Sequence, residues 1–200
     1  MANKRDIIIA FVIGGVFLFG MGLMTLLFIF AWSDQGEYID SGSGQIAIVE
    51  VFGPIYDSST PVRQIDKWAD RIDIEAIVVH VNSPGGGVAA SQEIYYAIER
   101  ARNDQGKIVV ISMSSVAASG GYYLACAGDI LVANPGTLTG SIGVIVQYPT
   151  FGELLEKIGI KYETVKSGDL KDVGNPSRSM TNEEKLMFKS VIMDSYEQFV

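Results

Sequence analysis

Residues 45–133 alternate between two patterns of apolar positions. Short runs rich in valine and isoleucine are typical of strands, and the segments between them carry apolar residues every three or four positions, as helices do. The patterns predict strands at 45–52, 75–81, 107–113 and 129–133, and helices from Thr60 to about 72, at 88–102 and at 119–127. Because parallel sheets with helical crossovers have strands of this kind, we expect an α/β domain of βα repeats whose sheet is covered on both faces.

The residues after 133 continue the alternation less regularly. Their apolar pattern predicts strands at 142–146 and 161–165, separated by a helix at 151–158. Thr181 and Glu184 form the T-x-x-E pattern of a capping box, which opens a helix that is predicted to be still running at Val200. We therefore expect the chain to stop inside a helix, with the C-terminal end of the domain incomplete.

A longer apolar run precedes the domain. Residues 7–33 contain no charged side chain, and at ~1.5 Å per residue they can span the ~30 Å hydrocarbon layer of a membrane. A cleavable signal peptide is the alternative, because residues 31–33 loosely fit a small-x-small cleavage site, but the apolar core of a signal peptide has only about 7–15 residues. We therefore predict an uncleaved transmembrane helix.

The charges that flank this apolar run predict its orientation. Lys4 and Arg5 precede the run and acidic residues follow it, so the N-terminus should stay in the cytoplasm and the folded domain should be extracytoplasmic. The predicted single-pass protein of the cytoplasmic membrane has a cytoplasmic N-terminus and anchor at 1–33, with the bilayer around 7–32, a flexible Gly/Ser tether at 34–44 and a folded domain at 45–200.

Composition narrows the class of protein. The formal net charge is -8 and no Lys/Arg cluster follows the first few residues, which argues against a nucleic-acid partner. The chain has one cysteine and one histidine, which excludes an internal disulfide framework and a Cys/His zinc site. Hydrophobic residues make up 48% of the chain, enough for a real core, so we expect one folded domain.

Two glycine- and serine-rich segments lie between a predicted strand and a predicted helix. The first, N-S-P-G-G-G at 82–87, either presents backbone N–H groups to an anion or serves only as a turn. In the second, Ser119 lies at a helix start, where the helix dipole and free N–H groups favour an alkoxide and a developing oxyanion. The alternative for Ser119 is a helix N-cap. The lipase-type elbow G-x-S-x-G is not matched, because Ala117 takes the first glycine position.

A serine nucleophile also needs a general base. The single histidine, His80, lies in an apolar strand, where a structural role with one hydrogen bond is the simpler interpretation. Lys171 lies in a glycine-flanked loop and Lys166 lies in the same region, so either lysine is a candidate base or a solvated loop residue. A lysine base must lose its proton near neutral pH, which normally requires burial.

Four motifs in this order carry a resemblance to a known family: N-S-P-G-G-G at 82–87, V-A-A-S-G-G-Y-Y at 116–123, T-G-S-I-G-V at 139–144 and S-G-x-x-K-D at 167–172. Residues 45–200 thereby resemble the SppA-type signal peptide peptidases, serine peptidases of the ClpP/crotonase-like fold. The resemblance implies that Ser119 is the nucleophile, that Lys171 is the base and that Ser141 hydrogen-bonds the lysine amine. It also implies an oxyanion hole formed by the backbone N–H groups of Gly86 and Gly120.

The resemblance also implies partners. No cofactor or metal would be needed, the substrates would be peptides, above all cleaved signal peptides, and half-length members are similar to homo-oligomeric rings whose serine and lysine come from neighbouring subunits. His80 stands where many relatives have a basic residue, and Ser114-Ser115 replaces a more usual Gly-Asp pair. Neither departure touches the proposed dyad.

Two other functions remain open from the sequence. An acyl-CoA enzyme would use similar paired backbone donors, but the predicted export argues against it, and a catalytically silent membrane scaffold would keep the fold without the chemistry. We expect Cys126 to be a packed small side chain rather than a nucleophile. Tyr122 and Tyr123 are expected either to line a substrate groove or to pack as aromatic side chains.

Overall fold

The computed structural model describes residues 13–15, 18–24 and 46–200, and the chain divides into two compact units, Met1–Gly42 and Ser43–Val200. In the first unit the described residues are helical. Most of the predicted anchor at 1–33 and all of the predicted tether at 34–44 lie outside the described residues. Within the part that is described, no helix has both the length and the apolar character needed to cross a membrane.

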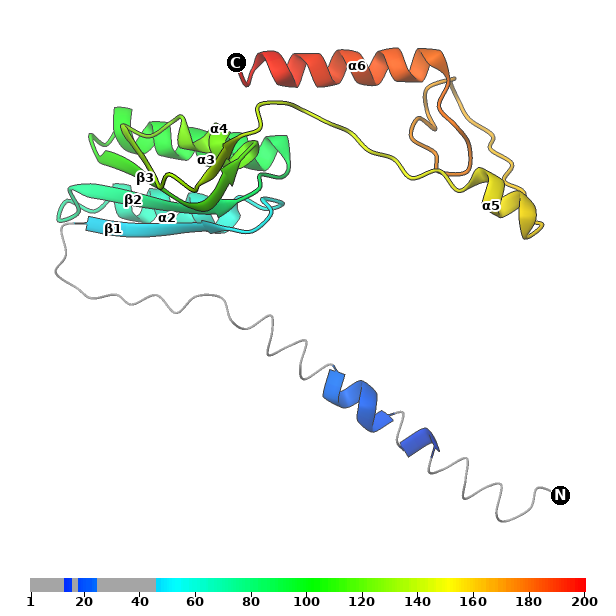
Figure 1. The fold of residues 1–200 in the computed structure, drawn as a ribbon, viewed down its shortest axis with the longest axis horizontal. Helices are drawn as coiled ribbons and strands as arrows, with labels where there is room; N and C mark the ends of the chain where they lie inside the picture. Colours follow the sequence, from blue (N-terminus) through cyan, green and yellow to red (C-terminus); the bar gives the residue numbers. More distant parts are fainter. Residues whose placement is uncertain (1–12, 16–17, 25–45) are drawn as a thin grey trace. The chain divides into compact units, whose positions relative to one another are not determined.

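The second unit is built on a parallel sheet (Figure 1). Its strands are β1 (Ile46–Phe52), β2 (Ala76–Ser83), β3 (Ile108–Ala118) and β4 (Ile130–Ala133), which lie side by side in that order, and β5 (Leu138–Gly140). The strand β4 pairs with the first half of β3, and β5 pairs with its last residues. The four strands predicted between residues 45 and 133 are confirmed, whereas the short β5 was not predicted.

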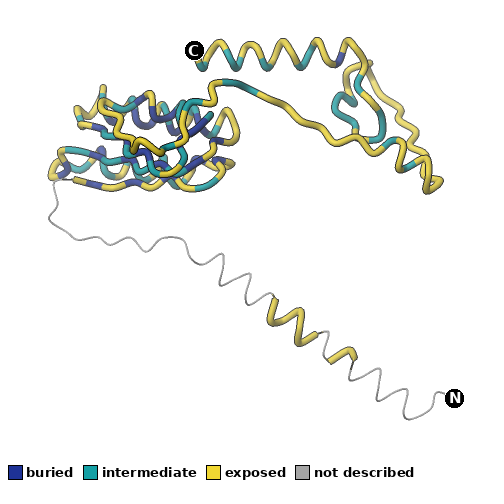
Figure 2. The backbone as a smooth tube through the Cα atoms, in the orientation of Figure 1, coloured by how far each residue is buried: buried dark blue, intermediate teal, exposed yellow. Residues whose placement is uncertain are grey.

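Three helices cover one face of this sheet: α2 (Ser59–Ala69), α3 (Val88–Asn103) and α4 (Gly120–Ala125). Alternate residues of β1, β2 and β3 point at these helices because the three strands pair in register. The buried residues concentrate in these strands and helices (Figure 2). Their apolar side chains form one cluster, which includes Val49, Val79, Ile111, Ile65, Ile94, Ile98 and Leu124. Burial of each large aliphatic side chain contributes about 1.5–3 kcal/mol, so this cluster holds the strand ends where β3 meets α4.

The opposite face of the sheet corrects the expectation of cover on both faces. The β1 residues Ile46 and Ile48 are 61% and 62% exposed, and Phe52 and Ile108 are also exposed. The apolar residues that made the strands look continuous therefore divide between a face packed against helices and a face that no described layer covers. Both faces of the sheet carry apolar residues, so the sequence pattern alone does not show which face the helices of this chain cover.

The segment 141–200 contains two helices, α5 (Gly152–Lys157) and α6 (Asn182–Glu197), as predicted. The predicted strands at 142–146 and 161–165 are wrong, because neither segment is assigned to a strand in the described chain. A strand needs a neighbour for its backbone hydrogen bonds. No described strand lies beside these segments, and side chains such as Ile145 and Val165 stay exposed.

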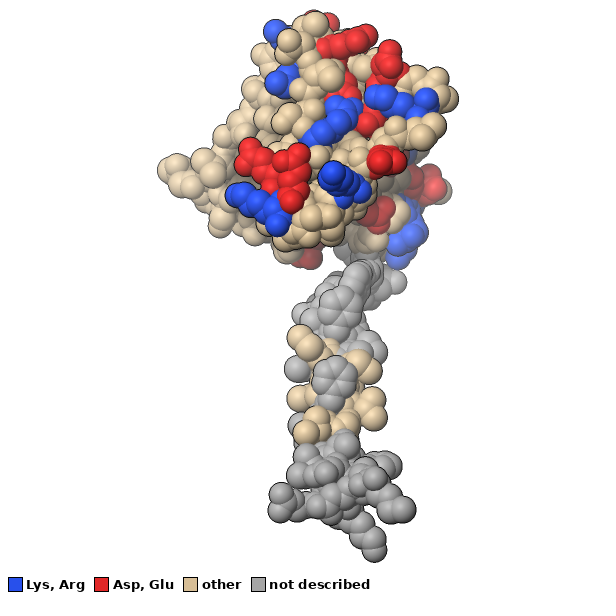
Figure 3. Space-filling view, turned by 90° about the vertical axis from the view of Figure 1, so that its right-hand side faces the viewer, with Lys and Arg blue, Asp and Glu red and all other residues tan. Residues whose placement is uncertain are grey.

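The capping box at the start of α6 is confirmed. The Glu184 backbone N–H donates to Thr181 Oγ1 at 3.2 Å, and the Thr181 backbone N–H donates to Glu184 Oε2 at 2.7 Å. The helix ends at Glu197 rather than continuing through Val200, which corrects the expectation that the chain stops within it. The face in Figure 3 carries acidic and basic side chains next to one another.

Candidate active site

Ser119 lies on a sharp turn between β3 and α4. Its backbone has φ 52° and ψ −122°, in the left-handed half of conformational space, which costs a non-glycine residue about 1–3 kcal/mol. Ser119 occupies the N-cap position of α4, but its side chain makes no capping hydrogen bond. The N-cap interpretation therefore does not explain this serine. A strained turn from strand to helix is how many hydrolases expose a nucleophile, and here it forms without the G-x-S-x-G signature.

The glycine-rich turn after β2 packs directly against this serine. At Gly85, where φ is +92°, an added Cβ would lie 2.6 Å from the backbone nitrogen of Gly120 and 2.9 Å from Ser119 Cβ. At Gly86, an added Cβ would lie 2.2 Å from the carbonyl oxygen of Ile55. Both positions exclude any side chain. The segment 82–87 is thus more than a chain reversal, because it brings its backbone against the Ser119 turn.

Two backbone amides beside Ser119 are available for an anion. An added Cβ on Gly120 would lie 3.3 Å from the Gly86 nitrogen, so the two glycines are immediate neighbours. In residues 46–200 neither the Gly86 nor the Gly120 amide has a backbone or side-chain acceptor. Neighbouring N–H groups without acceptors are the donors that stabilise an oxyanion. The arrangement has the composition of an oxyanion hole.

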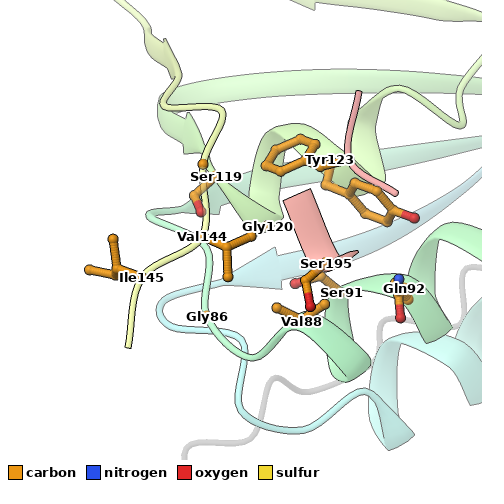
Figure 4. Close-up of a pocket in the computed structure, with 12 residues that line it drawn as sticks. Gly86, Val88, Ser91, Gln92, Ser119, Gly120, Tyr123, Val144, Ile145 and Ser195 are labelled. Atoms are coloured by element: carbon orange, nitrogen blue, oxygen red, sulfur yellow. The ribbon is translucent and has the colours of Figure 1, made fainter. Parts of the chain in front are cut away.

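Gly86, Ser119 and Gly120 line one cavity of about 110 Å³ (Figure 4). In that view the Ser119 hydroxyl points toward the loop that carries Gly86. The remaining lining combines apolar and polar side chains: Val88, Ser91, Gln92, Tyr123, Gly143, Val144, Ile145, Ser195 and Phe199. The space next to the hydroxyl therefore suits an uncharged or apolar side chain of a ligand.

The C-terminal end of the chain closes one side of this cavity. The rings of Phe199 and Tyr123 meet edge to face with centroids 5.1 Å apart, and the Gln92 amide donates to Gln198 Oε1 at 2.8 Å. Burial raises the pKa of Tyr123, which keeps its phenol neutral. Of the two tyrosines singled out in the sequence, Tyr123 lines the cavity and Tyr122 packs against the core.

Lys171 is not beside Ser119 in this chain. It is exposed and lines a different cavity, together with Ser167, Gly168, Asp169, Leu170 and Glu183. Ser141, the expected partner of the lysine amine, is also exposed and has φ 54° immediately after β5. The structure thus brings together Ser119, Gly86 and Gly120, and it leaves Lys171 apart from them.

The two candidate lysines differ in their partners. Lys166 Nζ lies 2.7 Å from Asp172 Oδ1 and donates to the carbonyl oxygen of Asp169 at 2.7 Å, so its amine already has partners. The Lys171 side chain has no hydrogen bond or ion pair within residues 46–200. Of the two, only Lys171 has an amine that is free to meet a serine.

The remaining candidate base and candidate nucleophile are His80 and Cys126. His80 Nδ1 lies 3.2 Å from Ser112 Oγ on the neighbouring strand, and the His80 ring contacts Phe52 edge to face, which confirms the structural interpretation. Cys126 is exposed, so the expectation that it packs is wrong. Desolvation raises the pKa of the Cys126 thiol, which disfavours the thiolate needed for nucleophilic attack.

Comparison with known protein families defines first a class and then a family. The model of the Clp proteases matches residues 48–136, which contain the sheet and the Ser119 turn, so the fold is of the ClpP-like α/β class. The model of peptidase family S49 matches residues 101–200, half of the chain. The chain belongs to peptidase family S49. The resemblance to SppA-type peptidases that the four motifs carry is thereby confirmed.

Individual relatives agree with this family. A Synechocystis protein named as a protease is 39% identical over 158 residues, which cover 78% of this chain and 56% of the relative. An Enterococcus faecium protein named as a signal peptide peptidase SppA is 36% identical over 169 residues, covering 84% of this chain and 47% of the relative. The chain thus spans about half the length of these two relatives. A solved structure of the 1510-N membrane-bound stomatin-specific protease covers 54% of this chain and 52% of its own, with a TM-score of 0.45 and 26% identity.

Proposed function

We propose that this S49 family member is a serine endopeptidase in which Ser119 is the nucleophile, Lys171 is the general base and the amides of Gly86 and Gly120 form the oxyanion hole. The observation that carries the proposal is the strained Ser119 backbone, with φ 52°, packed against two glycine amides that have no acceptor in the described chain. Backbone strain on a non-glycine residue beside free donors is typical of a catalytic turn.

Each group has a defined role in the proposed reaction. Neutral Lys171 Nζ takes the hydroxyl proton as Ser119 Oγ attacks the peptide carbonyl carbon, and the carbonyl oxygen becomes an oxyanion held by the Gly86 and Gly120 amides. The C–N bond then breaks, and the lysine returns the proton to the leaving amine. Water attacks the acyl-enzyme with Lys171 again as base, and hydrolysis restores Ser119. The lysine amine donates an N–H to Ser141 Oγ, which turns its lone pair toward Ser119.

We place the completed dyad between neighbouring copies of the chain in a homo-oligomeric ring. Two features support this: Lys171 lines a different cavity from Ser119, and it is exposed, whereas a neutral lysine base needs a desolvated position. Mixing Ser119→Ala protein with Lys171→Ala protein should then restore turnover, since mixed assemblies contain sites with both wild-type residues. Persistent inactivity of assembled mixtures would instead place both residues of the dyad in one subunit.

We propose apolar peptides as the substrate class, above all cleaved signal peptides. The cavity beside Ser119 is lined by Val88, Val144, Ile145 and Phe199, which suit apolar side chains. An anchor in residues 1–33 would hold the extracytoplasmic domain at the bilayer, where such peptides are released. A marked preference for soluble, highly charged peptides would contradict this assignment.

Hydrolysis of an apolar signal-peptide-like substrate by detergent-solubilised, assembled full chain tests the function over pH 6–10. We expect Ser119→Ala and Lys171→Ala to abolish turnover. The matched controls are Ser115→Ala and Lys161→Ala, which alter an exposed serine and an exposed lysine away from both cavities and should retain wild-type turnover. Wild-type turnover in Ser119→Ala would refute the mechanism, and an inert wild type would favour a silent scaffold.

A further inference from the structure

Four charged side chains form a connected cluster around the segment that carries Lys171. We call Lys166, Asp172, Arg178 and Glu184 the loop cluster. Lys166 Nζ and Arg178 Nη2 lie 2.7 Å and 2.9 Å from Asp172 Oδ1. The guanidinium of Arg178 also donates to both carboxylate oxygens of Glu184, at 2.9 Å for Oε2. The loop cluster therefore joins Asp172, the direct neighbour of Lys171, to Glu184 in the first turn of α6.

The loop cluster is better protected from water than an ordinary surface ion pair. The side chain of Glu184 is 1% exposed and that of Asp172 is 13% exposed, compared with 46% for Asp66 in its pair with Arg100. Arg178 holds the pKa of the Asp172 carboxyl well below its usual range and lowers the pKa of Glu184 to about 2, because it hydrogen-bonds both. Both carboxylates stay charged at working pH, and fork-like pairs of this kind fix geometry as well as charge.

Backbone hydrogen bonds fold the chain on both sides of Lys171 into turns. The Lys171 N–H donates to the Gly168 carbonyl at 3.1 Å, and the Asn175 N–H donates to the Asp172 carbonyl at 3.0 Å. The chain on both sides of Lys171 is therefore folded into successive turns, and Asp172 is the point at which they are held to Arg178. The other charged residues that line the cavity with Lys171 are Asp169 and Glu183.

We propose that the loop cluster positions the general base: Arg178 holds Asp172 and Glu184 together so that the Lys171 amine is presented in one place to the serine it serves. This inference rests on the proposed function, because it assigns a task to the loop that carries the base. The loop cluster lies outside the hydrophobic core, and its loss should leave the sheet and the Ser119 turn intact. Arg178 is thus a positioning residue, and it does not touch the reacting atoms.

Steady-state kinetics of the assembled full chain over pH 6–10 test this role, with wild type compared to Arg178→Gln. We expect kcat to fall roughly 10²-fold with little change in KM, because misplacing a catalytic group by about 1 Å costs this much. Arg178→Lys, which keeps one charge, should recover part of the rate.

Two further variants keep the test decisive. Arg100→Gln breaks an exposed ion pair outside both cavities and should retain wild-type rates. If Arg178→Gln fails to fold, Asp172→Asn provides the same test, because it leaves the Arg178–Glu184 pair and the helix cap in place. A folded Arg178→Gln or Asp172→Asn protein with wild-type kcat overturns the positioning role. In that event inactivity of Lys171→Ala would leave the dyad standing, whereas an active Lys171→Ala would refute the proposed function itself.

Discussion

The two parts of the folded unit differ most in how they bury their apolar residues. In residues 46–140 the alternate side chains of three strands pack against three helices, and residues such as Val79, Ile98 and Leu124 are fully buried. In residues 141–200, all of which the structure describes, the one buried side chain is Glu184, and large apolar residues such as Ile145 are exposed.

This difference separates a part with a hydrophobic core from a part without one. The part with the core also holds the proposed nucleophile, Ser119, and the amides of Gly86 and Gly120. The part without a core holds Lys171. Exposed apolar side chains gain stability when another surface covers them. This difference fits the proposal of a preformed Ser119 turn and a Lys171 that further protein surface brings into place.

The largest effect should come from cutting into the core. Ile98→Ala removes a fully buried side chain and should lower the free energy of unfolding by about 2–5 kcal/mol. In residues 141–200, Val165→Ala shortens a fully exposed side chain and should change the free energy of unfolding by less than about 0.5 kcal/mol. Denaturant unfolding of the dissociated protein measures both. Equal losses would show that residues 141–200 contribute a core of their own.

A smaller effect on stability but a large one on rate should follow from Gly86→Ala. The added Cβ would meet the Ile55 carbonyl oxygen at 2.2 Å, so the loop must shift and one oxyanion donor is lost. We expect kcat to fall by roughly 10²–10³-fold. Gly136→Ala is the matched control, because nothing lies within 4 Å of its added Cβ. Unchanged peptide hydrolysis in Gly86→Ala would remove this amide from the site.

The smallest effect should be a loosening of the loop cluster in acid. Arg178 lowers the pKa of both Asp172 and Glu184, so the unfolded chain takes up protons at higher pH than the folded one. The stabilisation is complete above the ordinary carboxyl pKa of about 4 and is lost as pH falls toward 2. Amide hydrogen exchange, corrected for the intrinsic rate at each pH, should increase in residues 166–184 before it does in β2 and β3. Simultaneous loosening of both parts would contradict this.

The sequence predicted the fold best where local pattern and packing agree. The strands β1 to β3 and the helix α3 were predicted because their apolar periods match the faces that they bury. The segments 142–146 and 161–165 have the same strand pattern but no strand beside them in the described chain. Local composition determines whether a segment is able to form a strand. Whether it does so depends on a neighbouring strand in the folded protein.

The candidate site was predictable in its residues but not in its geometry. The motifs singled out Ser119, Gly86 and Gly120, and the structure brings these three together. Nothing in the residue types shows that Ser119 adopts a left-handed backbone or that Lys171 stays apart, because both depend on how distant segments pack. The contacts of Arg178 with Asp172 and Glu184 were also not predicted. The signal was a basic residue between two acidic residues, Asp172 and Glu184, within one short stretch.

Labelling with a fluorophosphonate, which reacts with activated serine hydroxyls, tests the central claim most directly. The assembled full chain is treated at pH 8 and the modified residue is located by mass spectrometry, with Lys171→Ala and Lys161→Ala proteins treated in parallel. We expect modification at Ser119 in wild type and in the control variant Lys161→Ala. We expect no modification at Ser119 in Lys171→Ala. Peptide hydrolysis that is blocked by the reagent while Ser119 remains unmodified would contradict the assignment of Ser119 as the nucleophile.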